Sequence, residues 1–241
     1  MILLLGDIHG NFNVFNHYIK KYNFENVTFI QVGDFGIGYD KEETNLNNLT
    51  LLNNSLKETN NKLLVVRGNH DNPSYFNGNY VFSNLELLPD YTIKIIDNKN
   101  FLFIGGAISV DRQNSISYDH AMWLKGRSTQ TYWYDEKVVY NEDFIKNVRN
   151  IDVLITHTTT DFCYPSNKKY PKFVLDYFKI DPTLQKELKE ERELMTKIFN
   201  ELKLNNNITH HYYGHFHTSK NEEINGVKHI LLNINELIDF K

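Results

Sequence analysis

Aspartate, asparagine and histidine residues follow five short apolar segments of this sequence, directly after each segment ends. The segments are residues 2–5, 27–32, 63–66, 152–156 and 208–213, and the polar residues after them are Asp7, His9, Asp34, Asn69, His70, Asp71, His157, His215 and His217. Glycine precedes the polar group in four of these cases. Carboxylate, imidazole and amide groups are ligands for ions such as zinc, manganese and iron. The pattern therefore predicts a metal site assembled from several segments.

The number of candidate ligands favours two metal ions over one. The candidates are Asp7, His9, Asp34, Asn69, His157, His215 and His217. One ion cannot use them all, whereas two ions that share one carboxylate can, and that arrangement suits in-line attack on phosphorus by an activated hydroxide. Asp7 and His9 are separated by one residue, as are His215 and His217, so we expect extended backbone that points each pair to one side.

Helical patterns separate the first three segments. Phe12, Phe15 and Ile19 have helical spacing after the first segment, and Leu49 and Leu52 lie in a second such pattern before the third. A β-α-β-α-β order favours a mostly parallel sheet, and open α/β sheets place their chemistry at the carboxyl ends of strands.

The rest of the chain is less regular. We predict strands at 80–82, 92–96 and 101–104, helices at 141–148 and from Pro182 with Asp181 as its cap, and a hairpin at 222–234 around Asn225-Gly226. Segments 109–140 and 158–182 show no clear periodicity. We expect one domain over residues 1–241, with these two segments as irregular insertions beside the site.

Composition narrows the classes of function. The net charge of −4 disfavours a protein that grips extended nucleic acid through a basic surface. The sequence has no apolar run of the roughly 18 residues that cross a bilayer and no signal peptide, so we expect no membrane partner. The single cysteine, Cys163, fits a reducing compartment, and we expect the cytoplasm, or the host cytoplasm if the protein is viral.

The ordered motifs Asp7-x-His9, Gly33-Asp34, Gly68-Asn69-His70-Asp71, His157 and Gly214-His215-x-His217 resemble those of the calcineurin-like metallophosphoesterase superfamily over nearly the whole chain. The resemblance includes small bacterial and phage-type members. It implies an α/β fold, a four-layer sandwich in which two packed mixed β-sheets are flanked by helices, with a dimetal site at strand ends.

The resemblance also implies a role for each matching residue. Asp7, His9, Asp34 and His217 would hold one metal, and Asp34, Asn69, His157 and His215 would hold the other. His70 would protonate the leaving oxygen as a general acid. The two divalent ions would be manganese in the first instance, with iron or zinc as alternatives.

The sequence departs from protein phosphatases of this superfamily after Gly33-Asp34. Those enzymes continue with an Asp that orients the catalytic histidine and an Arg that contacts phosphate, and both are absent here. Arg67 and Arg112 are the remaining candidates for phosphate contact and are grouped with His70 as catalytic candidates. The alternative for both is a structural ion pair, which Arg112 would make with Asp111 or Glu136.

Several other residues have structural explanations. Cys163 is expected to be a structural thiol, and Lys168, Lys169 and Lys172 are expected to lie in a solvated loop. Among the remaining histidines, we expect His17, His120 and His229 at the surface, and His210 and His211 packed within a strand. Trp123, Tyr132, Trp133 and Tyr134 could stack on a nucleobase or pack the insertion onto the domain.

The leading hypothesis is a metal-dependent hydrolase of phosphomonoesters or phosphodiesters, acting on a small phosphorylated substrate, with a nucleotide as one candidate. The alternative is a non-catalytic phosphoesterase-fold scaffold that binds a protein partner. Such scaffolds usually lose ligands or the catalytic histidine, and this chain keeps both. A nuclease is disfavoured by the negative charge. The ligand motifs indicate the reaction and leave the substrate, the metal and the oligomeric state open.

Overall fold

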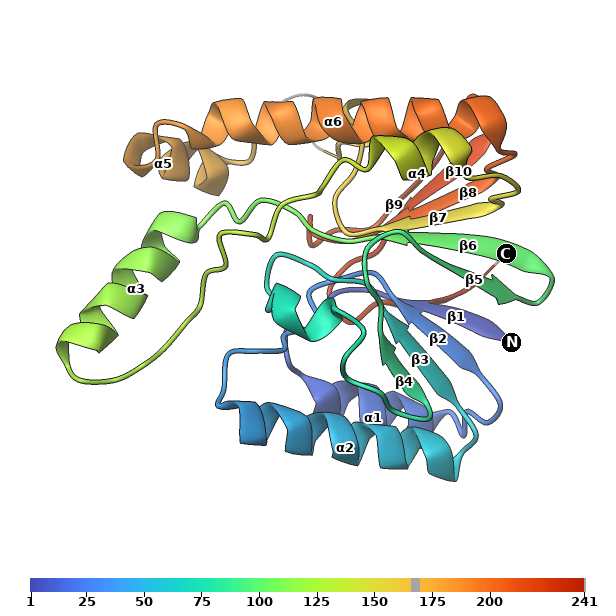
Figure 1. The fold of residues 1–241 in the computed structure, drawn as a ribbon, viewed down its shortest axis with the longest axis horizontal. Helices are drawn as coiled ribbons and strands as arrows, with labels where there is room; N and C mark the ends of the chain where they lie inside the picture. The colour runs from blue at the N-terminus through green and yellow to red at the C-terminus, as the bar shows by residue number, and fades with distance from the viewer. Residues whose placement is uncertain (166–169, 241) are drawn as a thin grey trace.

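Two mixed β-sheets pack face to face between layers of helices in the computed structural model, which describes residues 1–165 and 170–240 (Figure 1). The first sheet has the order β11-β1-β2-β3-β4 and the second the order β5-β6-β7-β8-β10-β9. The first contains β1 (Ile2–Leu5), β2 (Thr28–Gln31), β3 (Lys62–Val65), β4 (Leu85–Leu87) and β11 (Leu237–Asp239). The second contains β5 (Thr92–Ile96), β6 (Lys99–Ile104), β7 (Val153–Thr156), β8 (His210–Tyr213), β9 (Lys220–Ile224) and β10 (Val227–Leu231).

The helices cover the outer faces of the sheets. They are α1 (Phe12–Lys21), α2 (Glu42–Glu58), α3 (Arg112–Leu124), α4 (Glu142–Asn147), α5 (Lys172–Ile180) and α6 (Leu184–Asn205). Helices α1 and α2 lie against the first sheet, α4 and α6 lie against the second, and α3 projects away from the sandwich (Figure 1). The predicted four-layer α/β architecture is confirmed.

Strand β1 is apolar throughout because both of its faces are covered. Leu3 and Leu5 pack into the core beneath α1 and α2, whereas Ile2 and Leu4 pack into the core between the sheets. Successive side chains point to opposite faces, so a strand covered on both faces has no polar positions. Parallel pairing of β1, β2 and β3 brings their carboxyl ends to one edge of the first sheet, and parallel pairing of β6, β7 and β8 does the same in the second.

Three predicted elements need correction. Residues 80–82 form no strand, because Tyr80 stacks on Tyr75 and Val81 is 86% exposed, and the strand in this region is β4. Segment 109–140 contains α3, whose only buried residue is Arg112, so it lacks the apolar stripe that identifies a helix. Segment 158–182 contains α5 and a 3-10 turn, η2 (Asp161–Cys163). Lys168 and Lys169 lie outside the described residues, and Lys172 begins α5.

None of the helices in the described ranges is long and apolar enough to cross a membrane.

His211 and His229 form a buried network behind the end of β7. The Thr156 hydroxyl donates to the Thr158 carbonyl at 2.6 Å, so its oxygen accepts from His211 Nε2 at 2.8 Å. His211 Nδ1 is then the acceptor for His229 Nδ1, 3.1 Å away. His229 is fully buried, so its assignment to the surface is wrong. Burial lowers the pKa of His229 to about 4 and holds that of His211 well below its usual range.

Acidification should therefore destabilise the fold through these histidines. In the unfolded chain histidine has a pKa of about 6.5, so protons bind the unfolded state first and stability falls as the pH drops from 6.5 toward 4. The free energy of unfolding of the wild type should fall between pH 7.5 and pH 5. We expect His229→Gln to make that fall smaller by roughly 1–2 kcal/mol. Urea unfolding at both pH values measures this, with the exposed His17→Gln as the control. An unchanged pH dependence in His229→Gln would contradict the network.

Candidate dimetal site and catalytic histidine

The predicted ligands converge where the carboxyl ends of strands from both sheets meet. Asp7, His9, Asp34 and His217 each offer a ligand atom within 4.8 Å of the others, and Asp34, His157 and His215 form a second such group. Asp34 belongs to both groups. Asn69 Oδ1 lies 3.1 Å from His157 Nε2, so it also faces the second group.

Glycine permits the loops to approach one another this closely. A Cβ on Gly33 would lie 2.2 Å from His157 Nδ1, and a Cβ on Gly68 would lie 2.2 Å from Asp34 Oδ1. Gly33 also has a φ of +104°, which L side chains rarely adopt. Any other residue at either position would displace a candidate ligand.

The backbone at the ligands differs from the extended form expected from sequence. His9, Asp34, His215 and His217 have φ values of 44°, 54°, 72° and 49°. The expectation of extended Asp-x-His and His-x-His pairs is therefore wrong, and tight left-handed turns aim the side chains instead. Such backbone costs of order 1–3 kcal/mol per residue and concentrates at functional sites.

The electrostatics of the cluster fit divalent cations. Asp7 and Asp34 are 0% and 1% exposed, and Asp34 Oδ2 has no hydrogen-bond partner among the described residues. Burial raises the pKa of Asp7 to about 8, with Asp34 acting in the same direction and His157 opposing it. Burial also opposes ionisation of Asp34, but His157 and other histidines hold its pKa well below the usual range. Buried carboxylates are stable when paired with cations.

Burial favours the neutral form of three candidate histidine ligands, His9, His215 and His217. His9 Nε2 and His217 Nε2 lie 3.1 Å apart, and burial lowers the pKa of His9 to about 4 and also lowers that of His217. His157 differs: its Nδ1 donates to the Val32 carbonyl at 2.9 Å and its Nε2 lies 3.1 Å from Asp34 Oδ1. Burial lowers the pKa of His157, but Asp34 and Asp7 outweigh burial and raise it to about 9. Neutral imidazoles bind metals, so His9, His215 and His217 could hold an ion without first losing a proton, whereas His157 would release one on binding.

Two further groups that the sequence did not identify hold the ligand loops. Asp71 accepts backbone N–H bonds from Phe35, Gly36, Ile37 and Gly68 at 2.7–3.2 Å, which joins the loops after β2 and β3. Ser109 accepts from Asn69 Nδ2 at 2.9 Å and donates to Glu136 at 2.6 Å. These two hydrogen bonds leave Asn69 Oδ1 facing the cluster. The sequence motif contains Asp71 but does not indicate its role in joining the loops. The pairing of Ser109 with Glu136 could not be predicted, because no sequence spacing encodes it.

His70 lies beside the cluster and is held by a tyrosine. Its backbone N–H donates to Asp34 Oδ1 at 2.8 Å, and its ring centroid is 5.2 Å from that of His9. Tyr39 Oη lies 2.7 Å from His70 Nδ1, so Nε2 is the nitrogen available to a substrate. Trp133, which is 2% exposed, packs edge-on against Tyr39 at 5.0 Å. Tyr39 therefore occupies the orienting role for which the sequence offered no acidic residue.

The model of the family described as calcineurin-like phosphoesterase matches residues 1–219. The chain belongs to this family. The family and the two ligand groups support a metal-dependent phosphoester hydrolase with two divalent ions. No match was found among curated proteins.

Solved structures share the fold of this phosphoesterase. A dimetal phosphatase from Danio rerio has a TM-score of 0.52 and 14% sequence identity, with 97% of this chain and 87% of that chain covered. The phosphopantetheinyl hydrolase from Mycobacterium tuberculosis has a TM-score of 0.44 and 13% identity, with 97% and 90% covered. At 14% identity the likeness to the Danio rerio phosphatase shows the fold alone.

The two arginines predicted to contact phosphate make structural contacts in this phosphoesterase. Arg67 donates to Asp90 at 2.8 Å and to the Glu136 carbonyl at 2.7 Å. Arg112 pairs with Asp181 at 2.6 Å and Glu187 at 2.8 Å, not with Asp111 or Glu136. Their side chains are 5% and 7% exposed. Their guanidinium groups are engaged away from the metal ligands, which favours the structural alternative.

The remaining predicted features lie outside the ligand cluster. Cys163 is buried, and burial raises the pKa of its thiol to about 12, as expected for a structural thiol rather than a nucleophile. Tyr132 and Trp133 are buried, whereas Trp123 and Tyr134 are 69% and 78% exposed. Packing of the segment therefore explains the first two aromatic residues.

Removal of the shared carboxylate should abolish paired metal binding. Asp34→Asn keeps the side-chain shape but removes the negative charge common to both ligand groups. We expect the manganese content, measured by mass spectrometry after dialysis, to fall from about two ions per chain to one or fewer. Asp97→Asn, in the exposed turn after β5, is the matched control and should bind as the wild type does. Retention of both ions by Asp34→Asn would contradict a bridging role.

Proposed function

We propose that this protein hydrolyses phosphate esters of small molecules with two divalent ions and a histidine general acid. The observation that carries the proposal is the pair of ligand groups sharing Asp34, with His70 beside them. In the proposed assignment Asp7, His9, Asp34 and His217 hold one ion, and Asp34, Asn69, His157 and His215 hold the other. Manganese is the proposed metal, since mixed nitrogen and oxygen ligands accept it, and iron and zinc are alternatives.

The chain's own residues position the substrate and move the proton. The two ions, when bound, activate a water and neutralise the charge that develops on the phosphoryl oxygens. His70 Nε2 donates a proton to the leaving oxygen, and Tyr39 fixes the ring through Nδ1. Burial raises the pKa of Tyr39 above its usual value, so the phenol stays neutral and can donate to or accept from the imidazole.

Paired substrates test the reaction and its ester preference. We expect the manganese-loaded protein to hydrolyse p-nitrophenyl phosphate, bis-p-nitrophenyl phosphate or both, and Asp34→Asn to lose at least 100-fold in kcat/KM. Turnover of the diester points to a phosphodiesterase, and turnover of the monoester alone points to a phosphatase. Inactivity on both esters with metal bound would contradict the proposal and favour the scaffold alternative.

Leaving-group chemistry tests the role of His70. A nitrophenolate leaves without protonation, whereas an alkoxide requires it, so His70→Asn should slow alkyl ester hydrolysis by about 10²–10⁴-fold and nitrophenyl ester hydrolysis much less. The measurement is kcat for a matched series of leaving groups. Equal losses across the series would contradict general-acid catalysis and indicate a purely structural or binding role.

Tyr39→Phe removes only the hydroxyl that contacts His70. We expect kcat on a poor leaving group to fall about tenfold, the value of one hydrogen bond, with KM little changed and the pH profile of kcat displaced. The exposed and distant Tyr22→Phe serves as the control. A normal pH profile with an unchanged kcat would show that the contact does not orient the histidine.

A further inference from the structure

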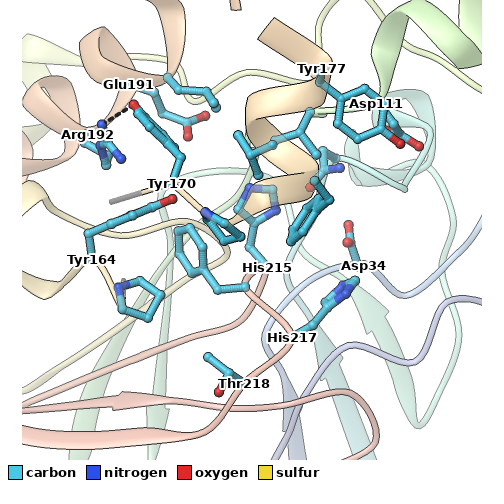
Figure 2. A pocket seen from close by; sticks show the side chains of 18 of the residues that line it. Asp34, Asp111, Tyr164, Tyr170, Tyr177, Glu191, Arg192, His215, His217 and Thr218 are labelled. Carbon is cyan, nitrogen blue, oxygen red and sulfur yellow. Dashed lines mark hydrogen bonds between the residues drawn. The ribbon is translucent and has the colours of Figure 1, made fainter. Parts of the chain in front are cut away.

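A cavity of about 510 Å³ opens beside the ligand cluster. Asp34, His70, His215 and His217 line it at the cluster, and residues of α5, α6 and the segment around Tyr164 line the remainder. Figure 2 shows Tyr164, Tyr170 and Arg192 on one side, Asp34 and His217 on the other, and His215 between them. A phosphoryl group held at the cluster would therefore place the rest of its molecule in this cavity. The volume lies in the range of small-molecule sites.

Aromatic side chains form a rigid wall of the cavity. Phe216 lies between His215 and His217, which fixes it next to the candidate ligands. Its ring packs edge-on with Tyr164 at 5.2 Å, and Tyr164 packs with Tyr170 at 6.0 Å. Arg192 places its guanidinium 4.3 Å from the centre of the Tyr164 ring and donates to Tyr170 Oη at 2.6 Å. Such a wall suits a flat, weakly polar group.

Glu191 supplies an unpartnered acceptor in the same cavity. The residue is 7% exposed and lines the cavity. Thr158 Oγ1 donates to Glu191 Oε2 at 3.1 Å, and Oε1 has no hydrogen-bond partner among the described residues. Burial raises the pKa of Glu191 to about 7, and the Thr158 hydroxyl opposes this shift. A ligand N–H group that meets Oε1 would stabilise the carboxylate form.

We infer that this cavity binds the base of a purine nucleotide, with an N–H edge of the base donating to Glu191 and its phosphoryl group at the ligand cluster. A purine buries two flat apolar faces and carries its polar atoms at the edge, which matches aromatic walls with Glu191 Oε1 beside them. A sugar would place hydroxyl groups against Phe216, Val174 and Leu188, whose side chains offer no hydrogen-bond partner. A simple phenyl group would leave Glu191 without a donor. The inference rests on the proposed phosphoesterase activity and specifies its substrate class.

Competitive inhibition tests the base site independently of ester type. The probes are adenosine, guanosine, ribose and benzyl alcohol, each added to hydrolysis of whichever p-nitrophenyl ester the wild-type manganese-loaded protein turns over. We expect at least one purine nucleoside to inhibit competitively, with an inhibition constant at least tenfold below those of ribose and benzyl alcohol. Equal inhibition by all probes, or none by either nucleoside, would overturn the inference while the observed turnover upholds the phosphoesterase function.

Removing the acceptor provides the second test. Glu191→Met keeps the side-chain volume and should raise the inhibition constant of the preferred nucleoside at least tenfold, with little change for benzyl alcohol. Glu190→Met, at an exposed position of the same helix, is the matched control and should retain the wild-type constants. Unchanged nucleoside inhibition in Glu191→Met would overturn the assigned contact. If Glu191→Met does not fold, the wild-type comparison of the four probes decides the inference.

Discussion

Burial of Asp7 and Asp34 side by side is the constraint on which this structure depends. Two carboxylates removed from water need cations or hydrogen-bond donors, and the backbone N–H groups of His215 and His70 supply only part of that requirement. His9, His215 and His217 add lone pairs, whereas His157, whose pKa is raised by Asp34 and Asp7 despite its burial, adds positive charge. The two sheets, joined through the apolar core between them, hold this arrangement in place, and divalent ions complete it. The strained left-handed turns at the ligands are tolerated because the sheets fix the ends of each loop.

Residues behind the candidate ligands hold the ligand loops in place through defined hydrogen bonds. Asp71 ties two loops together through four backbone bonds, and the chain from Asn69 through Ser109 to Glu136 joins the first sheet's loop to the segment after β6. These contacts set orientation without approaching a substrate. Tyr39 acts similarly on His70, with a neutral phenol where protein phosphatases of the superfamily have a carboxylate. A phenol orients the imidazole, but it stabilises an imidazolium less than a carboxylate does.

In the proposed function, substrate choice is separated in space from the ligand cluster. The cluster is built from loops at strand ends, whereas the walls of the adjacent cavity come largely from α5, α6 and the segment around Tyr164 (Figures 1 and 2). These peripheral elements can vary without disturbing the metal ligands, which is how one fold accommodates different substrates. Phe216 lies between two candidate ligands in the sequence and also lines the cavity, so it connects the ligand cluster with the proposed base site.

The sequence alone predicted the converging candidate ligands, because apolar runs that end in Asp, Asn or His are local patterns with a defined place in a parallel sheet. The two-sheet sandwich followed from the resemblance of those motifs to a known family. It did not determine helix α3, since a helix that buries only Arg112 lacks an apolar stripe. The partners of Arg67, Arg112 and Glu136 were also out of reach, because each is tens of residues away and no spacing rule encodes it. Only the tertiary structure brought Tyr39 to His70, since these residues lie in long loops after the paired strands β2 and β3, and brought Glu191 to the cavity, since that depends on how α6 packs.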